Sequence, residues 1–180
     1  MRLLVYRAGA LARLGHNHVI ESHALSGEVH LTAPGTLAGA AFSTTFPVAE
    51  LIVDAPAARG EEGREFEVQP SPGDIEGTRR NLLGSSVLDA AAFATLTVDG
   101  TTHATANGLS ATARLLVRGH ASTVEVPLSV TPAPQTLTVR GGFSVTQSSL
   151  GMTPFSIALG AIAVRDELEV RFEIVAALAT

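Results

Sequence analysis

The sequence predicts an all-β protein, a single extended antiparallel β-barrel over residues 1–180 with one short amphipathic helix. Three observations predict this fold. Short segments with alternating apolar and polar residues recur along the whole chain, Gly, Pro and Ser separate them, and only one segment has helical periodicity. Eight or more strands at such short spacing are typical of a barrel or a sandwich, and a chain of 180 residues commonly forms one such domain.

The clearest alternation lies in the second half of the chain. Residues 109–117 alternate, and the alternation resumes over residues 124–130 after a loop that contains glycine, which predicts a β-hairpin. A third strand is expected over residues 137–145. The last alternating region covers residues 162–174, where we expect the polar residues 165–167 to form a turn between two strands. The second half is therefore predicted to be an antiparallel meander.

The first half of the chain is less regular but contains the same kind of β-prone segment, separated by Gly, Pro and Ser. We expect short strands at residues 3–6, 18–20, 29–31, 41–46 and 51–53. Residues 55–63 contain one Pro, two Gly and several charges, and we expect them to form a solvated loop.

One segment, residues 71–84, has the features of a helix. Ser71 can cap its N-terminus, and the proline that follows suits the first turn. Three apolar side chains fall on one helical face, those of Ile75, Leu82 and Leu83. The sequence therefore predicts one amphipathic helix here.

Composition and charge exclude several classes of function. The net charge of −5 and the isoelectric point near 5.6 argue against nucleic acid and anionic lipid as partners. The chain has no Cys, so it has no disulfides, thiol nucleophile or thiolate metal site. No apolar run reaches the eighteen or so residues that a membrane-spanning helix needs.

The residues expected in the core are mostly small. Only 4% of the residues are aromatic although 46% are hydrophobic, and many Ala, Val and Leu would fill a barrel of about eight strands less completely than large rings would. This composition is compatible with an elongated cavity. The alternative is a solid core, because any β core shows apolar alternation; a filled interior would indicate an interaction domain without a ligand.

Four stretches of the sequence together resemble the YceI-like family of lipocalin-like barrels. Residues 79–90 and the following 93–98 are similar to its short helix, leucine/aspartate turn and strand, and residues 109–128 are similar to its glycine hairpin. Residues 143–152 resemble its late strand and glycine connection, and residues 166–170 its last strand. The family often has Pro where Ala94 stands and an aromatic residue where Val98 stands.

The resemblance implies a barrel that encloses a polyisoprenoid, an isoprenoid quinone or a similar amphiphile. It also implies export to the bacterial periplasm and a functional link to a membrane b-type cytochrome. Residues 1–13 lack a signal peptide, because Arg7 and Arg13 interrupt the apolar region, so a cytoplasmic location is expected if Met1 is the true start. A homodimer is left open as the oligomeric state.

We therefore expect a non-catalytic protein that binds a long hydrophobic molecule and requires no cofactor. Each buried methylene contributes about 0.8 kcal/mol, so a prenyl tail needs no charged anchor. The residues expected to line the ligand are Phe42, Phe46, Leu82, Leu83, Leu88, Phe93, Leu96, Leu116, Val126, Leu128, Phe143, Met152 and Phe155. A slip of one residue in register would exchange the two faces of a strand.

A metal- or haem-binding module is the alternative function. His16 and His18 lie two residues apart, so in a strand both imidazoles point to one face and could bind the same metal. A closed site would need further ligands. Those available are a histidine from the set His23, His30, His103 and His120 and a carboxylate such as Glu21 or Glu28.

Other chemistry has little support in the sequence. There is no G-x-S-x-G nucleophile elbow, and the glycines do not form a phosphate-binding pattern. Asp89 and Asp99 are better explained as turn residues than as an acid–base pair, and Arg79 and Arg80 as a solvated helix face. We expect no enzymatic activity.

Overall fold

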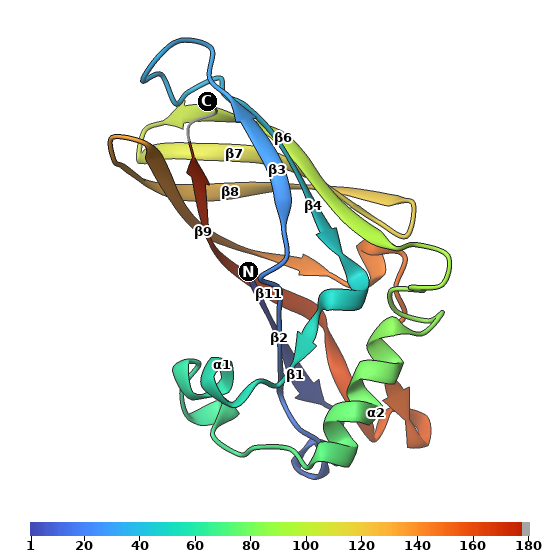
Figure 1. The fold of residues 1–180 in the computed structure, drawn as a ribbon. Coiled ribbons are helices and arrows are strands. Elements are labelled where there is room, and N and C mark those ends of the chain that lie inside the picture. The colour runs from blue at the N-terminus through green and yellow to red at the C-terminus, as the bar shows by residue number, and fades with distance from the viewer. Residues whose placement is uncertain (178–180) are drawn as a thin grey trace.

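The computed structural model describes residues 1–177, and one curled antiparallel sheet dominates it (Figure 1). The strands are β1 (Arg2–Ala8), β2 (His18–Glu21), β3 (Ser26–His30), β4 (Ala41–Pro47), β5 (Ile52–Val53), β6 (Thr95–Thr105), β7 (Gly108–Val117), β8 (His120–Pro132), β9 (Thr136–Thr146), β10 (Ser156–Ile157) and β11 (Ile162–Ala177). The helices are α1 (Pro56–Glu61) and α2 (Pro72–Leu83), with 3₁₀ turns η1 (Ala12–Leu14), η2 (Val48–Glu50), η3 (Arg64–Phe66), η4 (Ser148–Leu150) and η5 (Ala158–Gly160).

The order of the strands in the sheet is β3-β4-β6-β7-β8-β9-β11-β1-β2-β5, with β10 paired to β11. The two ends of this path belong to one long hairpin that is kinked. Its upper half is the pair β3–β4 and its lower half is the pair β2–β5, with β2 leading into β3 and β4 leading into β5. The hairpin therefore joins the two edges of the sheet through the chain itself, and the predicted all-β antiparallel barrel is confirmed.

The predicted glycine hairpin is the β7–β8 pair. Val117 pairs with His120, so the turn has two residues, Arg118 and Gly119. Both have positive φ, 52° and 77°, as the tight hairpin turn that matches the twist of the strands requires.

The turn predicted at residues 165–167 is wrong, because β11 runs through it without a break. Opposite β1, the register shifts between the pairs Val5–Leu168 and Arg7–Val164, so the polar residues form a β-bulge. The side chain of Gln147 donates to the carbonyl of Arg165 at 2.8 Å. The polar residues are thus accommodated in a β-bulge within the strand, where a side chain bonds to the backbone, and not in a turn.

The predicted amphipathic helix is α2, at the lower right of Figure 1. Ser71 and Asp74 form a reciprocal capping box, in which the Ser71 hydroxyl accepts from the Asp74 N–H at 3.2 Å. Ile75, Leu82 and Leu83 pack against the main core as expected. Within residues 1–177, neither helix is both long and apolar enough to cross a membrane.

The solvated loop predicted over residues 55–63 is wrong, since these residues form α1. Proline at the first turn starts this helix. Ala58 and, from the following η3, Phe66 are both 1% exposed and pack on the outer face of the sheet, against Leu4 of β1 and Val19 of β2. The charged side chains suggested a loop, but one face of the segment is a second, smaller core.

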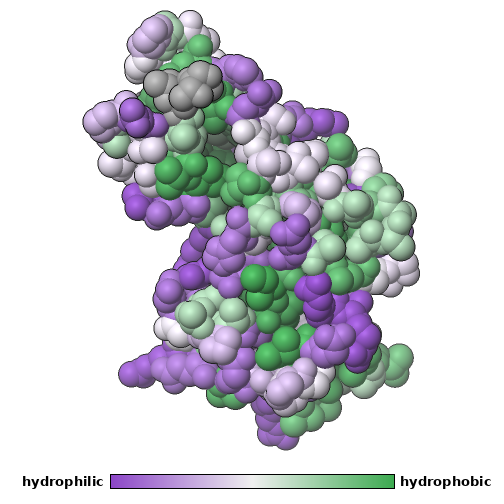
Figure 2. Space-filling model, viewed as in Figure 1, coloured by the Kyte–Doolittle hydropathy of each residue, from purple (hydrophilic) through white to green (hydrophobic). Residues whose placement is uncertain are grey.

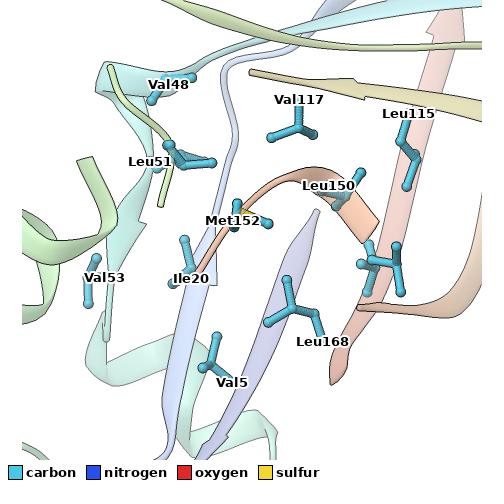
Figure 3. Close-up of a cluster of buried hydrophobic side chains, with 13 residues drawn as sticks. Val5, Ile20, Val48, Leu51, Val53, Leu115, Val117, Leu150, Met152 and Leu168 are labelled. Carbon is cyan, nitrogen blue, oxygen red and sulfur yellow. The ribbon is translucent and has the colours of Figure 1, made fainter. Parts of the chain in front are cut away.

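The main core fills the middle of the barrel (Figure 3). Leu115 and Val117 of β7 meet Leu150, Met152 and Leu168 there, all less than 9% exposed. The layer is made of branched aliphatic side chains and one methionine. It separates the upper part of the barrel, formed by β3, β4 and β6 to β9, from the lower part that carries both helices.

We predict that Phe66→Ala lowers the free energy of unfolding by about 3–5 kcal/mol, because it leaves a cavity beneath α1. Val68→Ala is the control from the same segment; its side chain is 71% exposed, so a change below about 0.5 kcal/mol is expected. Urea denaturation of both variants measures the difference. Equal, small effects would show that the second core contributes nothing.

Candidate functional site

The upper part of the barrel encloses an apolar chamber of about 150 Å³. Strands β3, β4, β6, β7, β8, β9 and β11 supply its wall. Small side chains leave the space open, since Ala111 and Ala113 of β7 point inward opposite the rings of Phe42 and Phe172. We call this space the upper chamber.

The lower part contains a second space of about 420 Å³, the lower chamber, between β1, β2, β11 and the helix α2. Its wall is apolar for the most part, but it also carries polar residues, which are His16, His18, Asp74, Thr78, Asn81 and Gln147. Side chains at its edge reach the solvent, among them Leu14, which is 61% exposed. Figure 2 shows hydrophobic residues at the surface of the lower half of the molecule.

The two chambers are stacked along the barrel, and the main core lies between them. On β6, Leu96 lines the lower chamber and Val98 the upper one. On β11, Leu168 lines the lower chamber and Val170 lines the upper one. Successive inward residues of one strand lie about 7 Å apart, so on β6 and β11 neighbouring inward residues face different chambers.

Most of the residues expected to line a ligand lie on the walls of these chambers. The upper wall includes Phe42, Phe46, Val126, Leu128 and Phe143. The lower wall includes Leu82, Leu88, Leu96, Met152 and Phe155.

Three residues of the predicted set line neither chamber. Leu116 pairs with Thr97 and points outward, because its neighbour Leu115 is the inward, buried residue. Leu83 packs against the main core from α2. Phe93 lies outside the barrel, 37% exposed, before β6 begins. Two adjacent leucines left the register of β7 ambiguous in the sequence.

A buried polar network fixes the ring of His18 at the wall of the lower chamber. Its Nδ1 lies 2.6 Å from Oδ2 of Asp54, the residue that follows β5. Oδ1 of Asp54 accepts from the Val19 N–H at 2.9 Å and from Arg59 at 2.5 Å. The side chain of Asp54 is fully buried and that of Arg59 is 3% exposed.

Arg59 of α1 joins this network to the chain around it. Its guanidinium also donates to the carbonyl oxygens of Asn17 and Val68, each at 2.7 Å. The ring of Phe66 lies 5.8 Å from the guanidinium carbon. Both charges are therefore held by several partners, as buried ions must be.

Asp54 is ionised in the folded protein. Burial acts to raise its pKa, but the hydrogen bonds from His18, Val19 and Arg59 outweigh burial and hold the pKa below its ordinary value of 3.8. An ionised carboxylate only accepts hydrogen bonds, so Nδ1 of His18 carries the hydrogen. In the neutral ring, Nε2 is then an acceptor, and no hydrogen bond within residues 1–177 uses it.

The sequence reasoning missed Asp54 and Arg59 because it treated their segment as a loop. A signal for the helix was present in Pro56, because proline is typical of the first turn of a helix. The five-residue spacing from Asp54 to Arg59 then places the guanidinium one turn into the helix, beside the carboxylate.

His16 and His18 share the lower chamber wall, as the prediction of a common face requires, with ring centroids 6.3 Å apart. The other candidate metal ligands do not join them: His23 pairs with Glu21, and His30 with Glu28. Across residues 1–177 there is no group of three or more His, Cys, Asp or Glu side chains that could hold a metal ion.

The chemistry of the lower chamber is that of a hydrogen-bonding site. An imidazole held by a carboxylate also occurs in hydrolases, where it activates a Ser or Cys nucleophile. The described wall of the chamber contains neither residue type. The arrangement therefore presents one oriented nitrogen atom to a mostly apolar space.

Comparison with solved structures shows which fold this is. BcnA of Burkholderia cenocepacia is similar with a TM-score of 0.64 and 19% identity over 97% of this chain and 96% of that one. The YceI protein of Campylobacter jejuni is similar with a TM-score of 0.62 and 10% identity over 89% and 85%. A variant of it with monobromobimane as a guest gives 0.63 and 10% over the same shares.

These likenesses show that the chain has the YceI fold, and the resemblance predicted from the sequence is confirmed at that level. No protein-family model matches the sequence, and no curated protein matches it either.

We predict that Asp54→Asn lowers the free energy of unfolding by about 3–5 kcal/mol, because it leaves the buried charge of Arg59 uncompensated. Asp99→Asn is the control: its ion pair with Arg114 is about half exposed on both sides, so a loss below about 1 kcal/mol is expected. Chemical denaturation measures both variants. A small effect of Asp54→Asn would show that the network does not stabilise the fold.

The same residue predicts a pH dependence. A carboxyl group whose pKa is lower in the folded state stabilises the fold above its unfolded pKa, near 3.8, and loses this contribution as the pH falls further. Wild-type stability should therefore fall between about pH 5 and pH 3 more steeply than that of Asp54→Asn. Parallel slopes would contradict the assignment.

Proposed function

We propose that this protein, which has the YceI fold, binds one long apolar amphiphile of the isoprenoid type inside its barrel. Binding is non-catalytic, and the ligand is carried or stored unchanged. The observation that carries the proposal is the pair of largely apolar chambers stacked in line inside one barrel.

The volumes indicate how long the ligand is. Chambers of about 150 and 420 Å³ together have the volume of about 20 molecules of liquid water, at about 30 Å³ each, and a methylene group is of similar size. The upper chamber alone is as large as cavities that hold one benzene ring, about 150 Å³. A tail of about 20 carbons therefore needs both chambers, and each methylene transferred from water contributes about 0.8 kcal/mol.

Such a tail must pass the layer between the chambers. That layer is formed by Leu96 and Val98 of β6 and by Leu168 and Val170 of β11, with neighbours from the main core. Changes of side-chain rotamer open a path of one methylene in width more readily than a movement of the sheet does. This layer therefore favours ligands with a slender chain that has no bulky substituents.

The alternatives have less support. A ligand-free interaction domain predicts a filled interior, and the chambers argue against it. A metal-ion site lacks a third ligand beside His16 and His18 in the described part of the chain. The periplasmic location, the homodimer and the link to a b-type cytochrome stay predictions.

We predict that the gently purified protein carries an added mass of a few hundred daltons in native mass spectrometry, and that organic extraction removes it. The extracted protein should then bind geranylgeraniol, a C20 isoprenoid alcohol. A clean mass in repeated preparations, together with no binding of this probe, would contradict the proposal.

The upper chamber can be blocked without exposing new surface. Ala111→Phe places a ring in the empty space, and a space of about 150 Å³ accommodates such a ring; we expect binding of geranylgeraniol to weaken at least about 10-fold. Thr123→Phe is the matched control, because Thr123 is exposed on the outer face of the adjacent β8. Equal affinities in both variants would place the ligand elsewhere.

A further inference from the structure

The polar groups of the barrel interior are not evenly distributed. On the upper wall, Thr44 and Thr102 supply the hydroxyl groups, and both already donate to backbone carbonyl oxygens, of Val98 and Leu37. A polar head placed there would lose its hydrogen bonds to water and gain none. If the protein binds an amphiphile as proposed above, its head therefore lies in the lower chamber.

The lower chamber offers one atom that is oriented for such a head. The side chain of His18 is 13% exposed, and its Nδ1 is committed to Asp54. None of the hydrogen bonds within residues 1–177 uses Nε2, and the side chain of His18 lies on the chamber wall. His16 shares the wall but has no carboxylate to orient it.

The charged residues around the lower chamber determine which charge the head group of the ligand can carry. Twelve arginines are the basic residues other than histidine, and none of them lies on the chamber wall. Asp74 is on the wall and Asp54 lies directly behind His18. Arg59 is already paired with Asp54. A phosphate or diphosphate would thus face the carboxylate of Asp74 without an arginine on the wall to pair with, which is unfavourable.

We propose that the lower chamber binds a neutral, hydroxyl-bearing head group, that of an isoprenoid alcohol or phenol, whose O–H donates to Nε2 of His18 while the tail extends into the upper chamber. Asp54 and Arg59 are positioning residues in this arrangement. They hold the imidazole in one tautomer and one orientation. The side chain of His18 therefore loses little conformational entropy when the ligand binds.

Three probes with the same C20 tail test the head. They are geranylgeraniol, its methyl ether, which has no O–H, and geranylgeranyl diphosphate. Because the chain has no Trp, binding is followed by displacement of the fluorescent dye N-phenyl-1-naphthylamine from delipidated full-length protein. We expect the alcohol to bind about 5-fold more tightly than the ether, the effect of one net hydrogen bond, and the diphosphate to bind more weakly than either.

Variants of His18 and His16 test whether the preference for the alcohol over the ether depends on His18. His18→Phe keeps an aromatic ring at this position. In this variant the alcohol and the ether should bind with about equal affinity, and the affinity for the ether should change little. His18→Gln retains an acceptor at a similar reach and should restore part of the preference. His16→Phe, on the same wall, should keep it in full.

Each outcome separates this inference from the function on which it rests. If none of the three probes binds, the proposed function fails. If alcohol and ether bind equally well, or if the diphosphate binds most tightly, the barrel is still a lipid carrier but the head assignment is overturned. Loss of the preference in His16→Phe and its survival in His18→Phe would also overturn it.

Discussion

The size of the inward side chains determines what the inside of this barrel can hold. The spacing of strands and residues in a sheet is fixed by backbone geometry, so side-chain volume alone decides whether a level of the barrel is solid. Strand β7 shows the change within one element. Ala111 and Ala113 leave the upper chamber open, whereas Leu115 and Val117, the next inward residues, belong to the solid layer in the middle. The hollow interior is thus encoded in alternate residues of the strands.

Closure of the sheet depends on a different device. The two ends of the strand path, β3 and β5, are joined by chain continuity through the kinked hairpin. At the lower end of that hairpin, Asp54 has a positive φ of 54° and bonds to Val19 of the neighbouring β2. Arg59 then fastens α1 over the outer face. The network that completes the lower end of the barrel is the same one that orients His18, so the stability of the fold and the proposed recognition of the ligand depend on the same residues.

The sequence predicts the fold well where local patterns and tertiary packing agree. The capping signal at Ser71 and the alternation in β7 to β9 are such cases, because each element's own residues specify it. Prediction from the sequence fails where a contact with a distant segment determines the local structure. The bulge at residues 165–167 exists because β1 and the chain around Gln147 satisfy its backbone groups. Leu116 illustrates a third limit: with three apolar residues in succession, only the pairing partners decide which faces inward.

The same reasoning explains why His18 was identified and its partners were not. Two histidines at a spacing of two indicate a shared face, which is a local property of a strand. The orientation of the imidazole is set by Asp54 and Arg59, which come from the residue after β5 and from α1. Because the edge of the lower chamber is apolar and partly exposed at Leu14, Phe155 and Ile157, an amphiphile can enter there with its tail first. In the complex proposed above, its head meets the imidazole of His18, whose orientation two distant segments have already fixed.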